Sequence, residues 1–106
     1  MKKKEMQKLE NQLVEKAWEK AKKVFTNASK DLDDLERLDY CQAWTYQTRG
    51  YSFLVSYATI VAFVDDNGNM YDVLRLVYGY TPTSAKHISK FRNKFRHVYE
   101  LTWREV

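Results

Sequence analysis

The sequence predicts an α+β domain in which a long N-terminal helix and a short second helix pack on a small antiparallel sheet that contains a β-hairpin, with a basic helix before the last strand. Three observations support this fold class. Apolar residues near the N-terminus recur every three or four positions, as on one face of a helix. Two runs of β-branched and aromatic residues flank Asn67-Gly68. A Thr81-Pro82 helix start precedes a second apolar stripe.

The length of 106 residues is typical of a single domain. We expect residues 1–39 to form a helical part and residues 40–106 to form a strand-hairpin-helix-strand part. The composition is 44% hydrophobic and 15% aromatic, which is typical of a folded chain and excludes intrinsic disorder.

The first predicted element is a long amphipathic helix from about Lys4 to about Phe25. Good helix formers fill this segment without Gly or Pro. One face carries an apolar stripe of Met6, Leu9, Leu13, Ala17, Val24 and Ala28, with Ala21 and Trp18 beside it. This stripe could also pair with a copy of itself, which makes a homodimer one possible assembly.

A second, short helix is predicted for residues 29–39, because Leu32, Leu35 and Leu38 repeat every three positions within an acidic run. Acidic side chains in its first turn suit the positive end of the helix dipole, and we expect the helix to end by Asp39.

The hydrophobic period then changes from a helical value to two, which is typical of strands. Alternation begins at Tyr40 to Tyr46, and Ser52 to Val64 is predicted as one strand. Asn67-Gly68 predicts a type I′ hairpin turn, and Met70 to Tyr78 is predicted as the returning strand.

The next predicted helix begins with Thr81 as its cap and Pro82 at its first position, where a missing N–H costs nothing. Its buried stripe is predicted to consist of Ala85, Ile88, Phe91 and Phe95. Alternation returns over 98–106, which we expect to form the last strand.

No motif in the chain predicts catalysis or a metal site. A calcium-binding loop starting at Asp65 would need Gly at its sixth and Glu at its twelfth position, where Met70 and Leu76 stand. The two histidines, His87 and His97, lack the further residues of a histidine-based nuclease site. We therefore expect no enzyme activity, no catalytic residue, no cofactor and no bound metal.

The exposed face of the last helix is the main candidate for a binding site. Between residues 84 and 97 there is no acidic residue but there are five cationic ones: Lys86, Lys90, Arg92, Lys94 and Arg96. These side chains could contact the phosphates of a nucleic acid or the carboxylates of a protein partner, or they could form a solvated face. The basic helix is our predicted site for a partner or a nucleic acid.

Aromatic side chains form a second candidate surface. They are too numerous for so small a core, although most are expected to be core or cross-strand pairs: Trp44, Tyr46, Tyr51, Tyr57, Tyr71, Tyr78, Tyr80, Tyr99 and Trp103. Exposed members could stack on bases or anchor a protein partner.

The distribution of charge favours an acidic or polyanionic partner. Residues 1–28 and residues 81–106 each carry a net charge of +4, whereas residues 29–39 carry −3 and residues 40–80 carry −1. Cys41 is the single cysteine, so no disulfide forms within the chain. No apolar run reaches the length of a membrane span, and we expect a cytoplasmic protein without membrane contact.

Three segments carry a resemblance to known proteins: residues 56–64 (SYATIVAFV), 71–75 (YDVLR) and 78–91 (YGYTPTSAKHISKF). Together they resemble a domain of small proteins from phages and other mobile elements of Gram-positive bacteria. Residues 1–50 depart from that domain. Many such proteins act by stoichiometric binding to a host factor, and anti-CRISPR proteins are a prominent class among them.

The resemblance implies a non-enzymatic inhibitor from a mobile element, acting in the bacterial cytoplasm on a host defence nuclease. The expected partner is a Cas9-type effector or its guide RNA. The alternative is a basic nucleic-acid-binding accessory or regulatory module of a phage. The sequence does not distinguish these partners, nor does it assign a role to Cys41, His87 or His97.

Overall fold

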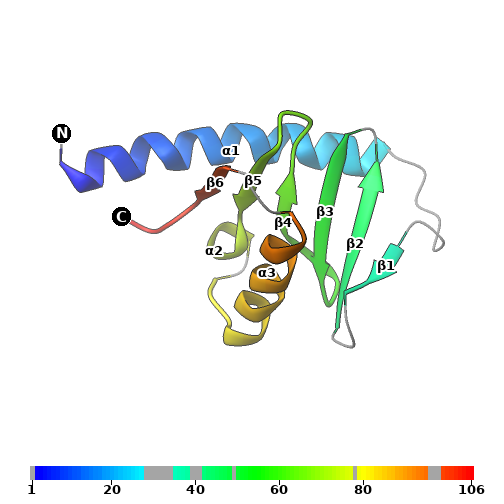
Figure 1. Cartoon of the computed structure of the whole chain (residues 1–106). Helices are drawn as coiled ribbons and strands as arrows, with labels where there is room; N and C mark the ends of the chain where they lie inside the picture. Colours follow the sequence, from blue (N-terminus) through cyan, green and yellow to red (C-terminus); the bar gives the residue numbers. More distant parts are fainter. Residues whose placement is uncertain (1, 28–34, 39–41, 49, 78, 96–98) are drawn as a thin grey trace.

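A computed structural model of the chain describes residues 2–27, 35–38, 42–48, 50–77, 79–95 and 99–106 (Figure 1). Three helices and a six-stranded sheet make up the described part, which confirms the α+β class. In chain order the elements are α1 (Lys3–Asn27), β1 (Leu35–Arg37), β2 (Ala43–Thr48), β3 (Tyr51–Ser56), β4 (Thr59–Val64), β5 (Asn69–Asp72), α2 (Leu74–Val77), α3 (Pro82–Lys94) and β6 (Tyr99–Thr102).

The sheet has the strand order β1-β2-β3-β4-β5-β6, so each strand pairs with its neighbours in the chain. All pairs are antiparallel except the last, in which β6 runs parallel to β5 after the chain passes through α2 and α3. A parallel pair requires a crossover connection, and the helices supply it.

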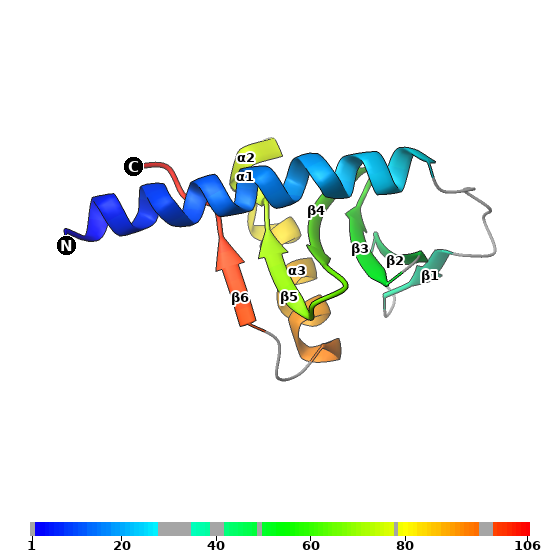
Figure 2. The same ribbon diagram turned by 90° about the horizontal axis from the view of Figure 1, so that it is seen from above.

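The sheet lies between two helical layers because successive residues of a strand point to opposite faces. Phe53, Phe63 and Tyr71 form a buried cluster with residues of α1. Their chain neighbours Leu54, Ala62 and Met70 belong to a second cluster that includes the α3 residues Ile88 and Phe91. In both views α1 crosses the strands, and its N-terminal turns extend beyond β6 (Figures 1 and 2).

The long N-terminal helix is confirmed, but the face that meets the sheet differs from the most regular apolar stripe. Asn11, Val14 and Ala21 are buried, and Trp18 and Phe25 pack beside them. The N-terminal part of the predicted stripe, Met6, Leu9 and Leu13, is instead exposed. The helix has apolar residues on two faces, and contact with the aromatic face of the sheet selects the one that contains Trp18 and Phe25.

Four local predictions are corrected. The last strand, predicted over 98–106, is β6 and ends at Thr102. Part of the predicted second helix lies outside the described residues, and the described part, Leu35–Arg37, is strand β1 because it pairs with residues 44–46 of β2. The predicted strand over 52–64 is two strands, β3 and β4, joined by a turn at Tyr57 and Ala58. The predicted strand over 70–78 ends at Asp72, and its continuation is α2.

The hairpin between β4 and β5 is confirmed, but its turn is not of type I′. That type needs positive φ at both central residues, and among the described residues of the loop only Gly68 has it. The Asp65 carboxylate accepts hydrogen bonds from the N–H groups of Asn67 and Asn69, which holds a wider loop with Gly68 in the left-handed conformation.

The basic helix and its cap are confirmed. The Thr81 hydroxyl accepts a hydrogen bond from the Ser84 N–H, and Pro82 occupies the first turn. Ile88 and Phe91 are buried, while Ala85 and Phe95 pack at the margin of the same cluster. No helix in the described part of the chain has the length and apolar character that crossing a membrane requires.

Candidate partner-binding surface

The outward face of α3 carries three lysines one turn apart, Lys86, Lys90 and Lys94, which we call the lysine ridge. All three are exposed, and the residues that face the sheet lie on the opposite side of the helix. Positions four apart lie on one face of a helix, about 6 Å apart along its axis. Lys94 makes a 3.5 Å ion pair with Glu36, whose side chain is 73% exposed, and such surface pairs contribute little to stability.

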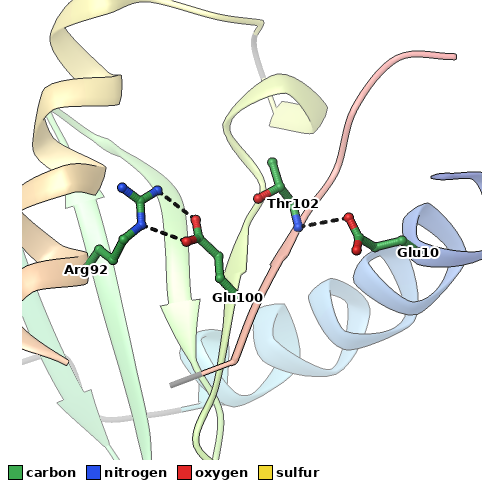
Figure 3. A network of polar contacts seen from close by, with 4 residues as sticks. All are labelled: Glu10, Arg92, Glu100 and Thr102. Carbon is green, nitrogen blue, oxygen red and sulfur yellow. Dashed lines mark hydrogen bonds and ion pairs between the residues drawn. The ribbon is translucent and has the colours of Figure 1, made fainter. Parts of the chain in front are cut away.

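Arg92, a further cation of the predicted site, is not on this ridge. Arg92 lies toward β6 and donates two hydrogen bonds to the Glu100 carboxylate, at 2.6 and 2.7 Å (Figure 3). These bonds raise the pKa of the Arg92 guanidinium above its usual range. A bidentate pair of this kind joins α3 to β6. Arg96 lies outside the described residues.

A buried polar network ties α3 to the end of β3. The Ser56 hydroxyl lies 2.8 Å from His87 Nδ1 and 3.0 Å from the Ser84 hydroxyl, and all three side chains are buried. Burial lowers the pKa of His87 below its usual range, and the charge of Lys90 lowers it further. The network positions the ridge against the sheet. Ser56 is fully buried, so its hydroxyl does not face a substrate.

Tyr57 lies in the turn between β3 and β4, next to His87 of α3. Its φ of 57° is the one positive value among the described non-glycine residues, and its side chain is 57% exposed. A bulky residue in this conformation costs about 1–2 kcal/mol, and such strain is concentrated at functional sites. The Tyr57 N–H donates to the Gln42 carbonyl at 2.8 Å, and its ring centroid lies 5.9 Å from that of His87. An exposed aromatic ring therefore lies against the helix that carries the lysine ridge.

Tyr57 is one of the nine aromatic residues named as a candidate surface, and its sequence context does not distinguish it from the other eight. No Gly, Pro or Asn marks the turn it occupies. One available signal was length, because an uninterrupted strand over 52–64 would exceed the usual ten or so residues. Of the other aromatics, Tyr46, Tyr51 and Tyr71 are buried in the α1 cluster, as expected for core rings, and Tyr78 lies outside the described residues.

A recess of about 820 Å³ lies between α3 and the C-terminal segment that contains β6. Its lining mixes both signs of charge: Arg75, Arg92 and Arg104 with Glu10, Asp72, Glu100 and Glu105. Burial raises the pKa of the Asp72 carboxyl, although the hydrogen bond that this carboxyl accepts from the Leu74 N–H opposes the shift. Because the charges nearly balance and Arg92 and Glu100 bind each other, the recess presents no single sign of charge to a ligand.

Within the described residues, no group of three or more His, Cys, Asp or Glu side chains is placed to hold a metal ion. The exposed lysines of α3 are suited to contacts with a negatively charged partner.

The buried state of His87 predicts a pH dependence of stability. Below pH about 6.5 the unfolded chain binds a proton at this position that the folded chain resists, so the folded state loses stability as the pH falls. The slope contributed by one such group is at most about 1.4 kcal/mol per pH unit. Urea unfolding of the wild type and of His87→Gln between pH 8 and pH 5 measures it. We expect the wild type to lose more stability than the variant over this range, and equal slopes would contradict the prediction.

Comparison with known proteins places most of the chain in one family. Residues 15–105 match a family model described as a family of unknown function (DUF8033). Neither the curated proteins nor the solved structures contain a match to the chain.

Proposed function

The chain belongs to the DUF8033 family, and we propose that it is a non-enzymatic inhibitor from a mobile element that binds a host defence nuclease in the bacterial cytoplasm. The proposed partner is a Cas9-type effector, contacted at its guide RNA or at an adjoining acidic surface. The single observation that carries the proposal is the lysine ridge on a helix whose His87 contacts the strained, exposed Tyr57.

The ridge supports a polyanionic target because its three cations follow one another at successive turns of a rigid helix. Each lysine that neutralises a phosphate adds affinity that falls with salt, by a slope of about −0.7 per contact on single strands. Three contacts would weaken binding about 20-fold between 50 and 200 mM salt. The α3 helix is anchored by Phe91, Ile88 and the His87 network, so the lysines are presented from a fixed support.

A non-enzymatic mode is supported by the buried position of the polar groups closest to a catalytic arrangement. Ser56 and His87 are at hydrogen-bond distance, as in a nucleophile and its base, but the protein interior encloses both. Inhibition would then be stoichiometric and would follow from occupation of the target.

Tyr57 favours a second candidate function, that of a nucleic-acid-binding accessory or regulatory module. An exposed ring next to lysines can stack on an unpaired base while the cations hold the backbone, which contributes about 1–3 kcal/mol per base. This function predicts binding to bare RNA or DNA, whereas the inhibitor function predicts a preference for the loaded nuclease.

The test is to measure binding of the purified chain to three targets at 50 and 200 mM salt: labelled guide RNA, duplex DNA, and a Cas9–guide complex. A cleavage assay with increasing inhibitor runs in parallel. Tighter binding to the complex than to the free RNA, with cleavage lost in proportion to added protein, would support the inhibitor. Equal salt-sensitive binding to bare nucleic acid, with cleavage unaffected, would reject the inhibitor and leave the accessory module.

Tyr57 offers a variant in which stability and binding change in different directions. Tyr57→Gly removes the ring and also the steric cost of the left-handed conformation. We expect folding stability to stay equal or to rise by about 1 kcal/mol, while affinity for RNA-containing targets falls by about tenfold. Tyr57→Phe is the matched control and should retain binding. Unchanged affinity in the glycine variant would remove Tyr57 from the binding surface.

A further inference from the structure

The outer face of α1 carries a second surface, independent of the lysine ridge. Met6, Leu9 and Leu13 are 57%, 50% and 57% exposed, although they are large apolar residues. Exposed lysines extend this row toward both ends of the helix, and successive members are alternately four and three residues apart. We call the whole series the α1 seam: Lys2, Met6, Leu9, Leu13, Lys16 and Lys20.

The seam points outward because the opposite side of α1 is held by specific contacts. Asn11 donates to the Arg104 carbonyl at 2.6 Å and accepts from the Arg104 N–H at 3.0 Å. Gln7 donates to the Thr102 carbonyl at 3.1 Å. These bonds, with the burial of Val14 and Ala21, fix the rotation of α1 about its axis.

The same side of α1 holds two of the four glutamates of the helix away from the seam. Glu10 accepts a hydrogen bond from the Thr102 N–H, and Glu15 accepts one from the indole N–H of Trp103 (Figure 3 shows the Glu10 contact). These carboxylates therefore face the body of the molecule. The other two glutamates, Glu5 and Glu19, are exposed beside the seam, and Glu19 forms a 2.8 Å ion pair with Lys22. The seam itself consists of lysines and apolar residues, so we expect its partner to supply both apolar and negatively charged groups.

The spacing indicates what shape the partner has. An alternation of three and four residues confined to one narrow stripe is the pattern of a coiled-coil interface, whereas a helix lying on a membrane presents a wider apolar face. The apolar centre of the seam is thus suited to the side chains of one other helix.

Charge argues against a second copy of this chain as that helix. A parallel pair would set each seam lysine opposite itself. An antiparallel pair that places Leu9 of one copy against Leu13 of the other would set Lys20 opposite Lys2. Both arrangements bring like charges together at the ends of the contact, which is destabilising.

We infer that the α1 seam binds an acidic amphipathic helix of another protein, with apolar residues at its centre and Asp or Glu at the positions that face Lys2, Lys16 and Lys20. Met6, Leu9 and Leu13 precede residues 15–105, which match the family model, so the apolar centre lies outside the matched segment. The seam is on α1 and the lysine ridge is on α3, which cover opposite faces of the sheet. The proposal for one surface can therefore be rejected while the proposal for the other stands.

The probe is a synthetic, fluorescein-labelled helical peptide of about 21 residues, or roughly 30 Å. It carries Leu at the three central seam positions and Glu at the outer ones. A matched peptide has Lys in place of those Glu residues. Fluorescence anisotropy with the full chain at concentrations up to about 100 μM detects affinities in the range of weak helix pairs. We expect the acidic peptide to bind at least about tenfold more tightly than the basic one.

Two variants test the two parts of the seam. Leu9→Gln with Leu13→Gln should weaken acidic-peptide binding at least about tenfold, because the apolar contact is lost. Lys16→Glu with Lys20→Glu should reverse the preference, so that the basic peptide binds better. Lys8→Gln, an exposed change on α1 outside the seam, is the control and should change neither value. Circular dichroism verifies that each variant is folded.

Equal binding of the two peptides, or no binding at the highest concentration, would overturn the inference. A dimer detected by light scattering would also overturn it if Leu9→Gln with Leu13→Gln abolishes that dimer, because the occupant of the seam would then be a second copy of the chain. A third outcome would also overturn the inference. The wild type would bind vesicles of phosphatidylcholine with one quarter phosphatidylglycerol, the double glutamine variant would not, and neither peptide would bind. The seam would then be assigned to an anionic lipid surface.

Discussion

Replacing Phe63 by alanine is expected to lower the free energy of unfolding by about 3–5 kcal/mol. Phe63 is fully buried in the middle of the sheet on the side that α1 covers. Its ring centroid lies 4.9 Å from Tyr71, 6.0 Å from Trp18 and 6.2 Å from Phe53. Removing the ring takes apolar surface out of contact and leaves a cavity that these neighbours cannot fill without moving.

Urea unfolding followed by circular dichroism measures this loss. Phe63→Leu keeps most of the volume and should cost clearly less than the alanine variant. Gln47→Ala, an exposed change on β2, should cost less than about 0.5 kcal/mol. Because a domain of this size has a stability of about 5–15 kcal/mol, the alanine variant would populate the unfolded state measurably on warming. A loss below about 1 kcal/mol would mean that α1 does not pack on Phe63 as described.

The second large effect concerns the lysine ridge. Reversing its charge with Lys86→Glu, Lys90→Glu and Lys94→Glu is expected to weaken binding to the Cas9–guide complex about 100-fold or more at low salt. Each reversal replaces an attraction by a repulsion, and about 1 kcal/mol for each of three sites multiplies to this factor. Folding should be little affected, because the ridge is exposed and the Lys94–Glu36 pair is a surface pair.

The matched control changes net charge equally on another surface. Lys3→Glu, Lys8→Glu and Lys23→Glu lie on exposed positions of α1 outside the seam. Binding should be measured at pH 8, because a glutamate at position 90 would favour a proton on His87. Retained binding in the control and lost binding in the ridge variant locates the site on α3. Equal losses in both would show that affinity follows net charge, and intact binding in the ridge variant would exclude the ridge.

Much of the architecture followed from local sequence signals that need no distant partner. Thr81 caps α3 by accepting a hydrogen bond from the Ser84 N–H, and Pro82 fits the first turn, where no N–H is needed. The Asn67-Gly68 segment forms a hairpin because Gly68 adopts positive φ without steric cost. The helical character of α1 came from its composition and spacing in the same way. These features depend on residues only a few positions apart, so they were predictable.

The errors arose in short segments whose intrinsic preference is weak, so that hydrogen bonds with a neighbouring strand or with a capping residue decide their structure. Leu35–Arg37 has the leucine spacing of a helix but extends to pair with β2. Leu74–Val77 has strand-forming residues but turns into α2, which Asp72 caps through the Leu74 N–H. In both places a segment of three or four residues has too little intrinsic preference to resist hydrogen bonding with its surroundings.

The candidate site likewise has features that the sequence predicts and features that only the tertiary structure decides. The sequence alone indicated that α3 is cationic and which of its faces is buried, because both follow from residue type and helical spacing. It did not indicate that Arg92 binds Glu100, that Tyr57 lies next to His87 in a strained turn, or that Met6, Leu9 and Leu13 remain exposed. Those facts depend on which surfaces meet when the layers pack, and a helix with apolar residues on two faces can be oriented only by the sheet against which it packs.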